Sequence, residues 1–179
     1  MPHLRTAAVA VAATCLVLTG GAATAATKSV KDKSGDAAQT ADITSVQVRN
    51  DDRTLAISAK LAKAGSGRTH LVATLTSTTE GAPTYIARTV VLPAKGKSQA
   101  KRIGATLEVL AVDATETAPV ECEGIKATLS SGRNGRSLMR IPQSCLGEDA
   151  GTLLVDVVTV SSSDEIADEI AKPLRVKRG

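Results

Sequence analysis

The chain has almost no aromatic side chains. Its 179 residues include no Phe, no Trp and a single Tyr, Tyr85. Proteins that bind single-stranded nucleic acid stack the bases on aromatic rings, so this shortage argues against a nucleic-acid partner. Sugars are usually held against Trp or Tyr as well, which weakens a sugar-binding interpretation. Val, Ile, Leu and Ala must fill the core, and together with abundant Thr they favour thin β-strands packed in layers.

Catalytic motifs are lacking too. Beyond the first 25 residues His70 is the one histidine, and no G-x-S-x-G motif accompanies it. The sequence contains no P-loop, dinucleotide-binding fingerprint, EF-hand loop or H-E-x-x-H motif. Two cysteines and one histidine cannot supply the four ligands of a zinc site. We therefore interpret His70 as a surface or edge-strand residue and predict no enzyme activity, no catalytic residue and no cofactor.

The first 25 residues have the layout of a secretory signal peptide. Arg5 provides a positive start, Ala7–Leu18 is an apolar run, and Ala23-Thr24-Ala25 is a small-residue cleavage site. The apolar run is too short to span a bilayer. A lipoprotein is excluded because Cys15 lies within that run. We expect a secreted, extracellular protein that starts at Ala26, with no integral membrane segment after cleavage.

Two cysteines remain beyond the signal peptide, Cys122 and Cys145. An even pair in an exported chain is typical of a disulfide bond. The turn sequence Gly132-Arg133-Asn134-Gly135 lies almost midway between them, and a hairpin folded there would bring the cysteines within a residue or two of each other. Closing a loop of this length stabilises a fold by about 3 kcal/mol.

From residue 41 onward, apolar and polar residues alternate in short segments separated by turns. This pattern predicts one domain, residues 41–179, that folds as an all-β antiparallel sandwich of the Ig-like or jelly-roll-like kind. Residues 26–40 are polar and are interpreted as a flexible leader or a loose edge segment. The expected strands are Ile43–Val48, Leu55–Leu61, His70–Ser77, Tyr85–Leu92, Ala105–Val112, Gly124–Leu129, Ser137–Ile141, Thr152–Val160 and Leu174–Lys177.

One segment, Ser162–Lys172, carries a helical signal. Ser162 and Glu165 have capping-box spacing, and Ile166 and Ile170 lie one turn apart. A helix of this length needs tertiary packing to persist, so a short C-terminal helix and its absence both stay open. In the helical alternative, the acid pairs Asp164-Glu165 and Asp168-Glu169 form its solvated face.

Three acidic residues near the start of the domain suggest calcium, because hard cations take several oxygen ligands. They are Asp32, Asp36 and Asp42. Their spacing matches no ion-binding loop, and Lys31 and Lys33 partly cancel their charge. A solvated polar loop is the favoured interpretation, so no metal ligand is predicted and calcium binding at these residues stays an open question.

The densest basic cluster is the loop that contains Lys95, Lys97, Lys101 and Arg102. It could contact phosphate or an anionic cell-wall polymer. The net charge of the chain is only +4, and a mild charge spread along a chain usually serves solubility. We therefore favour a solvated loop.

Three segments resemble small exported proteins of high-GC Gram-positive bacteria. They are D-K-S-G-D-A-A…A-D-I-T-S-V-Q-V-R-N at the start of the domain, M-R-I-P-Q-S-C-L-G, and the closing V-K-R-G. The resemblance extends over about Asp32–Gly179. It implies a β-sandwich and pairing of Cys122 with Cys145, and it implies no activity. The chain departs from that group in its lack of aromatic residues.

Together these observations lead us to expect a secreted, monomeric, non-enzymatic β-sandwich. Its partner would be a protein or a cell-wall or other envelope component, bound through loops or an exposed sheet face. The alternative is an exported protease inhibitor or hydrolase. An inhibitor would need a rigid exposed loop, which the segment around Cys122 or Cys145 could provide.

Overall fold

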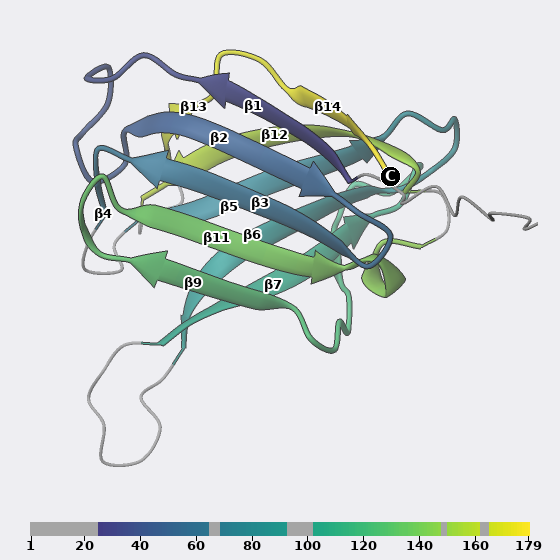
Figure 1. Cartoon of the computed structure of the whole chain (residues 1–179). Helices are drawn as coiled ribbons and strands as arrows, with labels where there is room; N and C mark the ends of the chain where they lie inside the picture. The colour runs from purple at the N-terminus through teal and green to yellow at the C-terminus, as the bar shows by residue number, and fades with distance from the viewer. Residues whose placement is uncertain (1–24, 65–68, 93–101, 148–149, 162–164) are drawn as a thin grey trace, which may run out of the picture.

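The described part of the chain is an antiparallel β-sandwich. The computed structural model describes residues 25–64, 69–92, 102–147, 150–161 and 165–179. Figure 1 shows one sheet in front of the other, with their faces packed together. The expected signal peptide lies outside the described residues, apart from Ala25. Lys95, Lys97 and Lys101 of the basic loop also lie outside them.

All strand pairs are antiparallel, and the two sheets are built from strands far apart in the sequence. The five-stranded sheet has the order β1 (Ala26–Lys31), β2 (Ile43–Asn50), β3 (Thr54–Leu61), β11 (Arg136–Pro142) and β9 (Lys126–Ser130). The seven-stranded sheet has the order β13 (Ile166–Glu169), β12 (Thr152–Val160), β5 (His70–Ser77), β6 (Thr84–Leu92), β7 (Arg102–Leu110) and β8 (Ala118–Pro119), and β14 (Leu174–Lys177) also pairs with β12. Two short strands, β4 (Lys63–Ala64) and β10 (Gly132–Arg133), pair with each other, and a 3-10 helix, η1, covers Gln143–Cys145.

The core lies between the two sheets and contains aliphatic side chains, as the composition predicts. The period-2 alternation places one side of every long strand inward. Large side chains that are fully buried include Ile43, Val46, Val48, Leu55, Ile57, Leu75, Met139, Ile141, Leu153, Val155 and Val157. Most of the outward residues of the same strands are exposed or half-buried, which is why the sequence pattern identified these strands.

Part of the expected flexible leader is an ordered edge strand. Residues 26–31 form β1, which pairs with β2 from Ala26 opposite Asn50 to Lys31 opposite Ser45. Val30 packs against the core cluster. The segment has little hydrophobic pattern because an edge strand gains its order from backbone hydrogen bonds to one neighbour. Residues 26–31 are therefore an edge segment and not a flexible leader.

The sequence leaves two alternatives open for Ser162–Lys172, and the described part of that segment contains no helix. Residues Ile166–Glu169 form β13, which pairs with β12 so that Asp168 lies opposite Thr159. Ile166 is 66% exposed and Ile170 is 2% exposed, so the two isoleucines do not share one buried face. An isolated helix of this length is marginal in water, whereas the edge of β12 offers backbone hydrogen bonds. Residues 162–164 lie outside the described residues.

The disulfide between Cys122 and Cys145 is confirmed, with the two Cα atoms 5.4 Å apart. It closes the end of a hairpin formed by β9 and β11, in which Ser130 lies opposite Arg136. The turn of this hairpin contains Asn134 with φ of 55°, a left-handed conformation that Asn tolerates well. The hairpin interpretation of the Gly132–Gly135 sequence is therefore confirmed as well.

Candidate functional site

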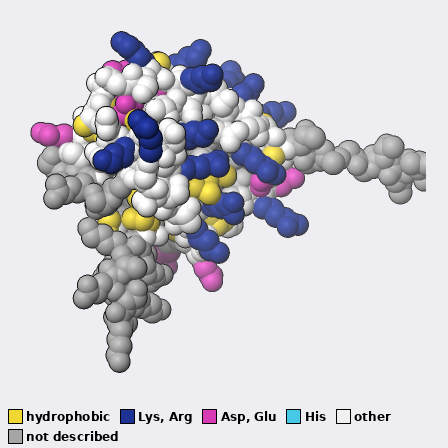
Figure 2. Space-filling view, turned by 60° about the vertical axis from the view of Figure 1, so that its left-hand side comes forward, with side chains coloured by type: hydrophobic (Ala, Val, Ile, Leu, Met, Phe, Trp, Pro, Cys, Tyr) yellow, Lys and Arg dark blue, Asp and Glu magenta, His cyan; other side chains and the backbone are white. Residues whose placement is uncertain are grey.

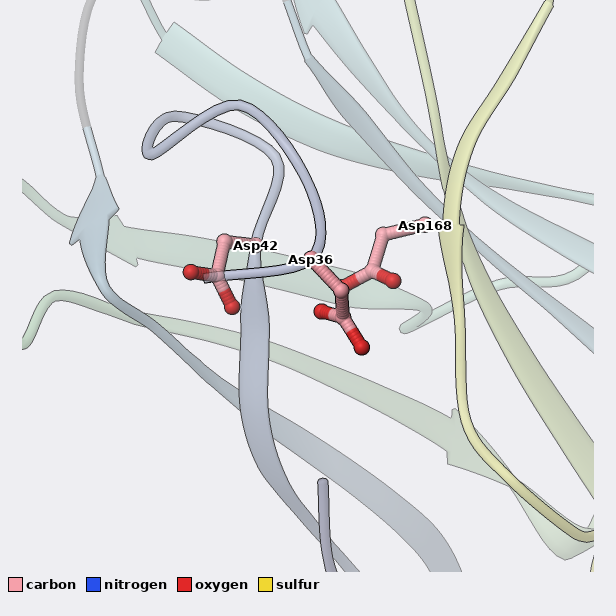
Figure 3. A group of neighbouring side chains, drawn as sticks. All are labelled: Asp36, Asp42 and Asp168. Carbon is pink, nitrogen blue, oxygen red and sulfur yellow. The ribbon is translucent and has the colours of Figure 1, made fainter. Parts of the chain in front are cut away.

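Three acidic residues from the start and the end of the domain's sequence lie close together in space. Asp36 and Asp42 belong to the segment between β1 and β2, and Asp168 lies on β13. Each residue contributes a carboxylate oxygen, and these oxygens lie within 4.8 Å of one another. In the view of Figure 3, the carboxyl groups of Asp36 and Asp168 lie next to each other between the segment that precedes β2 and the chain that carries Asp168, and the carboxyl group of Asp42 lies on the other side of its segment. We call these three residues the acidic cluster.

The segment that carries Asp36 and Asp42 is anchored by several backbone groups. The carbonyl oxygen of Ala41 accepts a buried hydrogen bond of 2.9 Å from Thr159 Oγ1, on β12 of the opposite sheet. The carbonyl oxygen of Gln39 accepts one of 2.9 Å from the backbone N–H of Lys63. These contacts hold the segment in place, so the acidic cluster is positioned by the fold.

Asp42 is the most buried member of the cluster, with 1% of its surface exposed. Its Oδ2 accepts a 2.7 Å hydrogen bond from the backbone N–H of Gly35. Its Oδ1 is buried and has no hydrogen-bond partner among the described residues. A buried carboxylate oxygen without a partner is costly, so this atom calls for a ligand.

Asp168 is half-buried and is held by two backbone groups. Its Oδ2 accepts a 2.6 Å hydrogen bond from the N–H of Ile43, and its Oδ1 accepts one of 2.9 Å from the N–H of Glu169. Burial raises the pKa of Asp168 above its ordinary value, and the neighbouring carboxylates of Asp32 and Asp36 raise it further, while the two hydrogen bonds act in the opposite direction. The raised pKa therefore reflects mainly the burial of Asp168, to which the negative charges of Asp32 and Asp36 add.

Asp32, Asp36 and Asp42 are the three acidic residues that the sequence suggested for calcium, and the structure changes the membership of that group. Asp36 and Asp42 come together, but the third carboxylate is that of Asp168, which the sequence suggested for a helix face. Asp32 lies close enough for its charge to affect Asp168, and its Oδ2 is buried without a partner among the described residues. No local signal could have joined residue 168 to the group.

A second candidate surface is the outward face of the five-stranded sheet. Among the outward residues of its strands there is no Asp or Glu. The exposed cations on this face are Lys31, Arg49, Lys60, Lys126, Arg136 and Arg140, which we call the cationic face. In the view of Figure 2, Lys and Arg side chains spread over the described surface and clearly outnumber Asp and Glu.

The strand register places like charges directly opposite each other on the cationic face. Lys60 on β3 lies opposite Arg136 on β11, and Arg140 on β11 lies opposite Lys126 on β9. Two such pairs on one face are unfavourable, because like charges at directly opposed positions repel. Within the described residues the one ion pair of this face is at its end, where Arg49 lies 3.4 Å from Asp51.

His70 lies at the start of β5 and is half-buried. Its Nδ1 is 2.8 Å from the carbonyl oxygen of Thr89. The partner of the ring is therefore a backbone group and not a hydroxyl nucleophile, and the arrangement is typical of a structural histidine.

The described residues define the protein as an all-β sandwich that contains the intramolecular disulfide Cys122–Cys145. No protein-family model, no curated protein and no solved structure matches the chain. The resemblance to exported proteins of high-GC Gram-positive bacteria therefore stays a prediction. Among the residues that the structure describes, no helix is long and apolar enough to cross a lipid bilayer.

Proposed function

We propose that the protein is an exported, non-enzymatic binding module whose cationic face holds an anionic polymer of the cell envelope. The observation that carries this proposal is that the two members of each of two cationic pairs lie directly opposite each other on neighbouring strands. These pairs are Lys60 with Arg136 and Lys126 with Arg140. Such pairs reduce the stability of the free sheet. A ligand that carries repeated negative charges would offset the repulsion at both pairs.

The dimensions of the face suit a polymer better than a single small anion. Its cations are distributed from Lys31 on β1 to Lys126 on β9, a distance of four strand spacings or roughly 19 Å. An open depression on the face is lined by residues that include Gln47, Arg136 and Arg140. A chain with phosphate or carboxylate groups at regular intervals could contact several of these cations at once.

Two further features support an envelope polymer over nucleic acid. The chain has one aromatic residue, whereas proteins that bind single strands use aromatic stacking platforms. The disulfide of Cys122 and Cys145 fits an oxidising compartment outside the cytoplasm, in agreement with the expected signal peptide. Because the face offers cations and hydroxyl groups, it suits the binding of an anion.

The test is binding of the purified protein to an immobilised phosphodiester-linked polyol polymer, at salt concentrations from about 50 mM to about 200 mM. The double variant Lys126→Glu/Arg140→Glu should lose at least about tenfold in affinity, which corresponds to about 1.4 kcal/mol, and its salt dependence should be weaker. The matched control is Arg175→Glu/Lys177→Glu, which changes the net charge equally at exposed positions of β14 in the other sheet.

The control variant should bind the polymer nearly as well as the wild type. Equal losses in both double variants would contradict the proposal, because they would reflect net charge and not the cationic face. Absence of binding by the wild type at low salt would contradict it as well. Equal affinity for duplex DNA would overturn the assignment of the ligand to an envelope polymer.

A further inference from the structure

We propose that Asp36, Asp42 and Asp168 bind a hard divalent cation, Ca²⁺, which joins the segment between β1 and β2 to β13. Their carboxylate oxygens lie within 4.8 Å of one another, and a cation between them would contact all three. Carboxylates are the main protein ligands of calcium, which accepts six to eight oxygens in a flexible arrangement. The cluster contains neither Cys nor His, so zinc is not the expected ion.

Burial of Asp42 is the independent observation that points to a ligand. This residue is 1% exposed, and its Oδ1 has no hydrogen-bond partner among the described residues. Its other oxygen is held by the backbone N–H of Gly35 at 2.7 Å, so the carboxyl group has a defined orientation within the cluster. A buried anionic oxygen that is left free by the fold is available as a metal ligand.

The surroundings of the cluster do not neutralise it. Within the described residues, none of its three carboxylates forms an ion pair with a cationic side chain. Two cationic residues, Lys63 and Arg133, line the same surface depression as Asp42, but neither forms an ion pair with it. The charge of Asp32 adds to the negative potential at Asp168. A divalent cation would offset this concentration of negative charge.

The chemistry of the three positions favours calcium over magnesium. Asp36 is exposed, so water can complete the coordination on that side. Asp168 is already held by the N–H groups of Ile43 and Glu169, which limits its adjustment. Magnesium requires near-ideal octahedral geometry and keeps several of its water ligands, whereas calcium tolerates irregular sites. Extracellular calcium modules often have dissociation constants of about 0.1–1 mM.

The bound cation would stabilise the folded protein, because its ligands come from segments that are far apart in the sequence. Asp36 and Asp42 precede β2 of the five-stranded sheet, and Asp168 belongs to the edge strand of the seven-stranded sheet. The unfolded chain does not bring these residues together. A ligand that binds only the native state raises the melting temperature in a concentration-dependent manner.

The experiment is thermal unfolding of the purified protein, first stripped with a chelator and then titrated with CaCl₂, MgCl₂ or KCl at matched ionic strength. We expect calcium to raise the melting temperature with a midpoint in the millimolar range or below, and isothermal titration calorimetry to give one Ca²⁺ per chain. Asp36→Asn is the decisive variant, because no hydrogen bond to the Asp36 side chain is found among the described residues.

In Asp36→Asn the calcium-dependent rise should disappear, while the melting temperature without calcium should stay the same or increase, because one repelling charge is gone. Glu169→Gln, at the exposed neighbour of Asp168 on the same strand, is the matched control and should retain the full calcium response. Asp42→Asn should lose the response as well.

Four results would overturn the proposal. They are no rise with calcium, an equal rise with KCl, an unchanged calcium response in Asp36→Asn, and an equal response to magnesium. The polymer-binding experiment is carried out in chelator with substitutions on the cationic face, so the failure of one proposal is distinguishable from the failure of the other.

Discussion

The backbone N–H of Ile43 donates a 2.6 Å hydrogen bond to Oδ2 of Asp168, a residue 125 positions further along the chain. Ile43 begins β2 of the five-stranded sheet, and Asp168 belongs to β13 of the seven-stranded sheet. A single side chain near the end of the sequence therefore satisfies a backbone donor at the start of the domain. The same carboxyl group belongs to the acidic cluster, so that cluster is part of the contact between the two sheets.

Replacement of Asp168 by Ala should lower the free energy of unfolding by about 1–3 kcal/mol, because the N–H of Ile43 loses its acceptor. Ile43 is fully buried, so solvent cannot easily replace that acceptor. Asp168→Asn keeps a side-chain oxygen and should lose less. Urea unfolding of both variants in chelator measures the difference, and equal losses would show that the hydrogen bond is not the source of the stabilisation.

Removal of the disulfide through Cys122→Ala/Cys145→Ala should reduce the free energy of unfolding by about 3 kcal/mol, because the unfolded chain regains the freedom of a loop of roughly two dozen residues. The two cysteines are separated by 23 positions in the sequence. Guanidinium unfolding without reductant is the measurement. An unchanged transition midpoint would contradict the stabilising role of this bond.

Gly135→Ala should destabilise the protein by about 1–3 kcal/mol, the usual cost of overpacking. A Cβ atom at Gly135 would lie 2.2 Å from the Cβ of Ala64 and 2.5 Å from the carbonyl oxygen of Ser130. Gly151→Ala is the matched control, because a Cβ there meets nothing within 4 Å. Thermal melts should separate the two variants, and similar melting temperatures would show that the β4–β10 contact can move apart.

Lys126→Glu should stabilise the free protein by about 0.2–1 kcal/mol while it weakens polymer binding, because it turns the repulsion with Arg140 into attraction. Lys177→Glu is a suitable comparison, since Lys177 lies opposite the uncharged Thr152. Melting temperatures at low salt measure this effect. A loss of stability in Lys126→Glu would mean that the cationic pair has a structural role, and would remove the main support for the cationic face.

Most of the strands and the disulfide could be predicted from local features. Alternation of apolar and polar residues marks a strand that is buried on one side, and it predicted the bounds of β5, β12 and β14 as the structure has them. The turn sequence at Gly132–Gly135 predicted a hairpin that brings the two cysteines within a residue or two of each other. The observed register, continued along both strands, places Cys122 opposite Ser144, beside Cys145. Each inference depended on residues close together in the chain.

The edge strands β1 and β13 were harder to predict, because their order comes from a neighbouring strand. The segment of β1 is polar, and that of β13 mimics a helix through the spacing of Ile166 and Ile170. In both cases backbone hydrogen bonds to an adjacent strand determine the conformation. Every residue type can accept such bonds and every type except Pro can donate them, so they leave little trace in the sequence.

The sequence by itself determined that this protein is an aliphatic all-β domain with a disulfide-closed hairpin, because those properties follow from composition, alternation and one turn. Only the tertiary structure decided which charges meet. The strand order β1-β2-β3-β11-β9 sets Lys60 against Arg136, and the approach of β13 to the start of β2 brings Asp168 to Asp36 and Asp42. The physical reason is that electrostatic interactions depend on distance in space, and strand pairing across the sandwich creates proximities that are independent of distance along the chain.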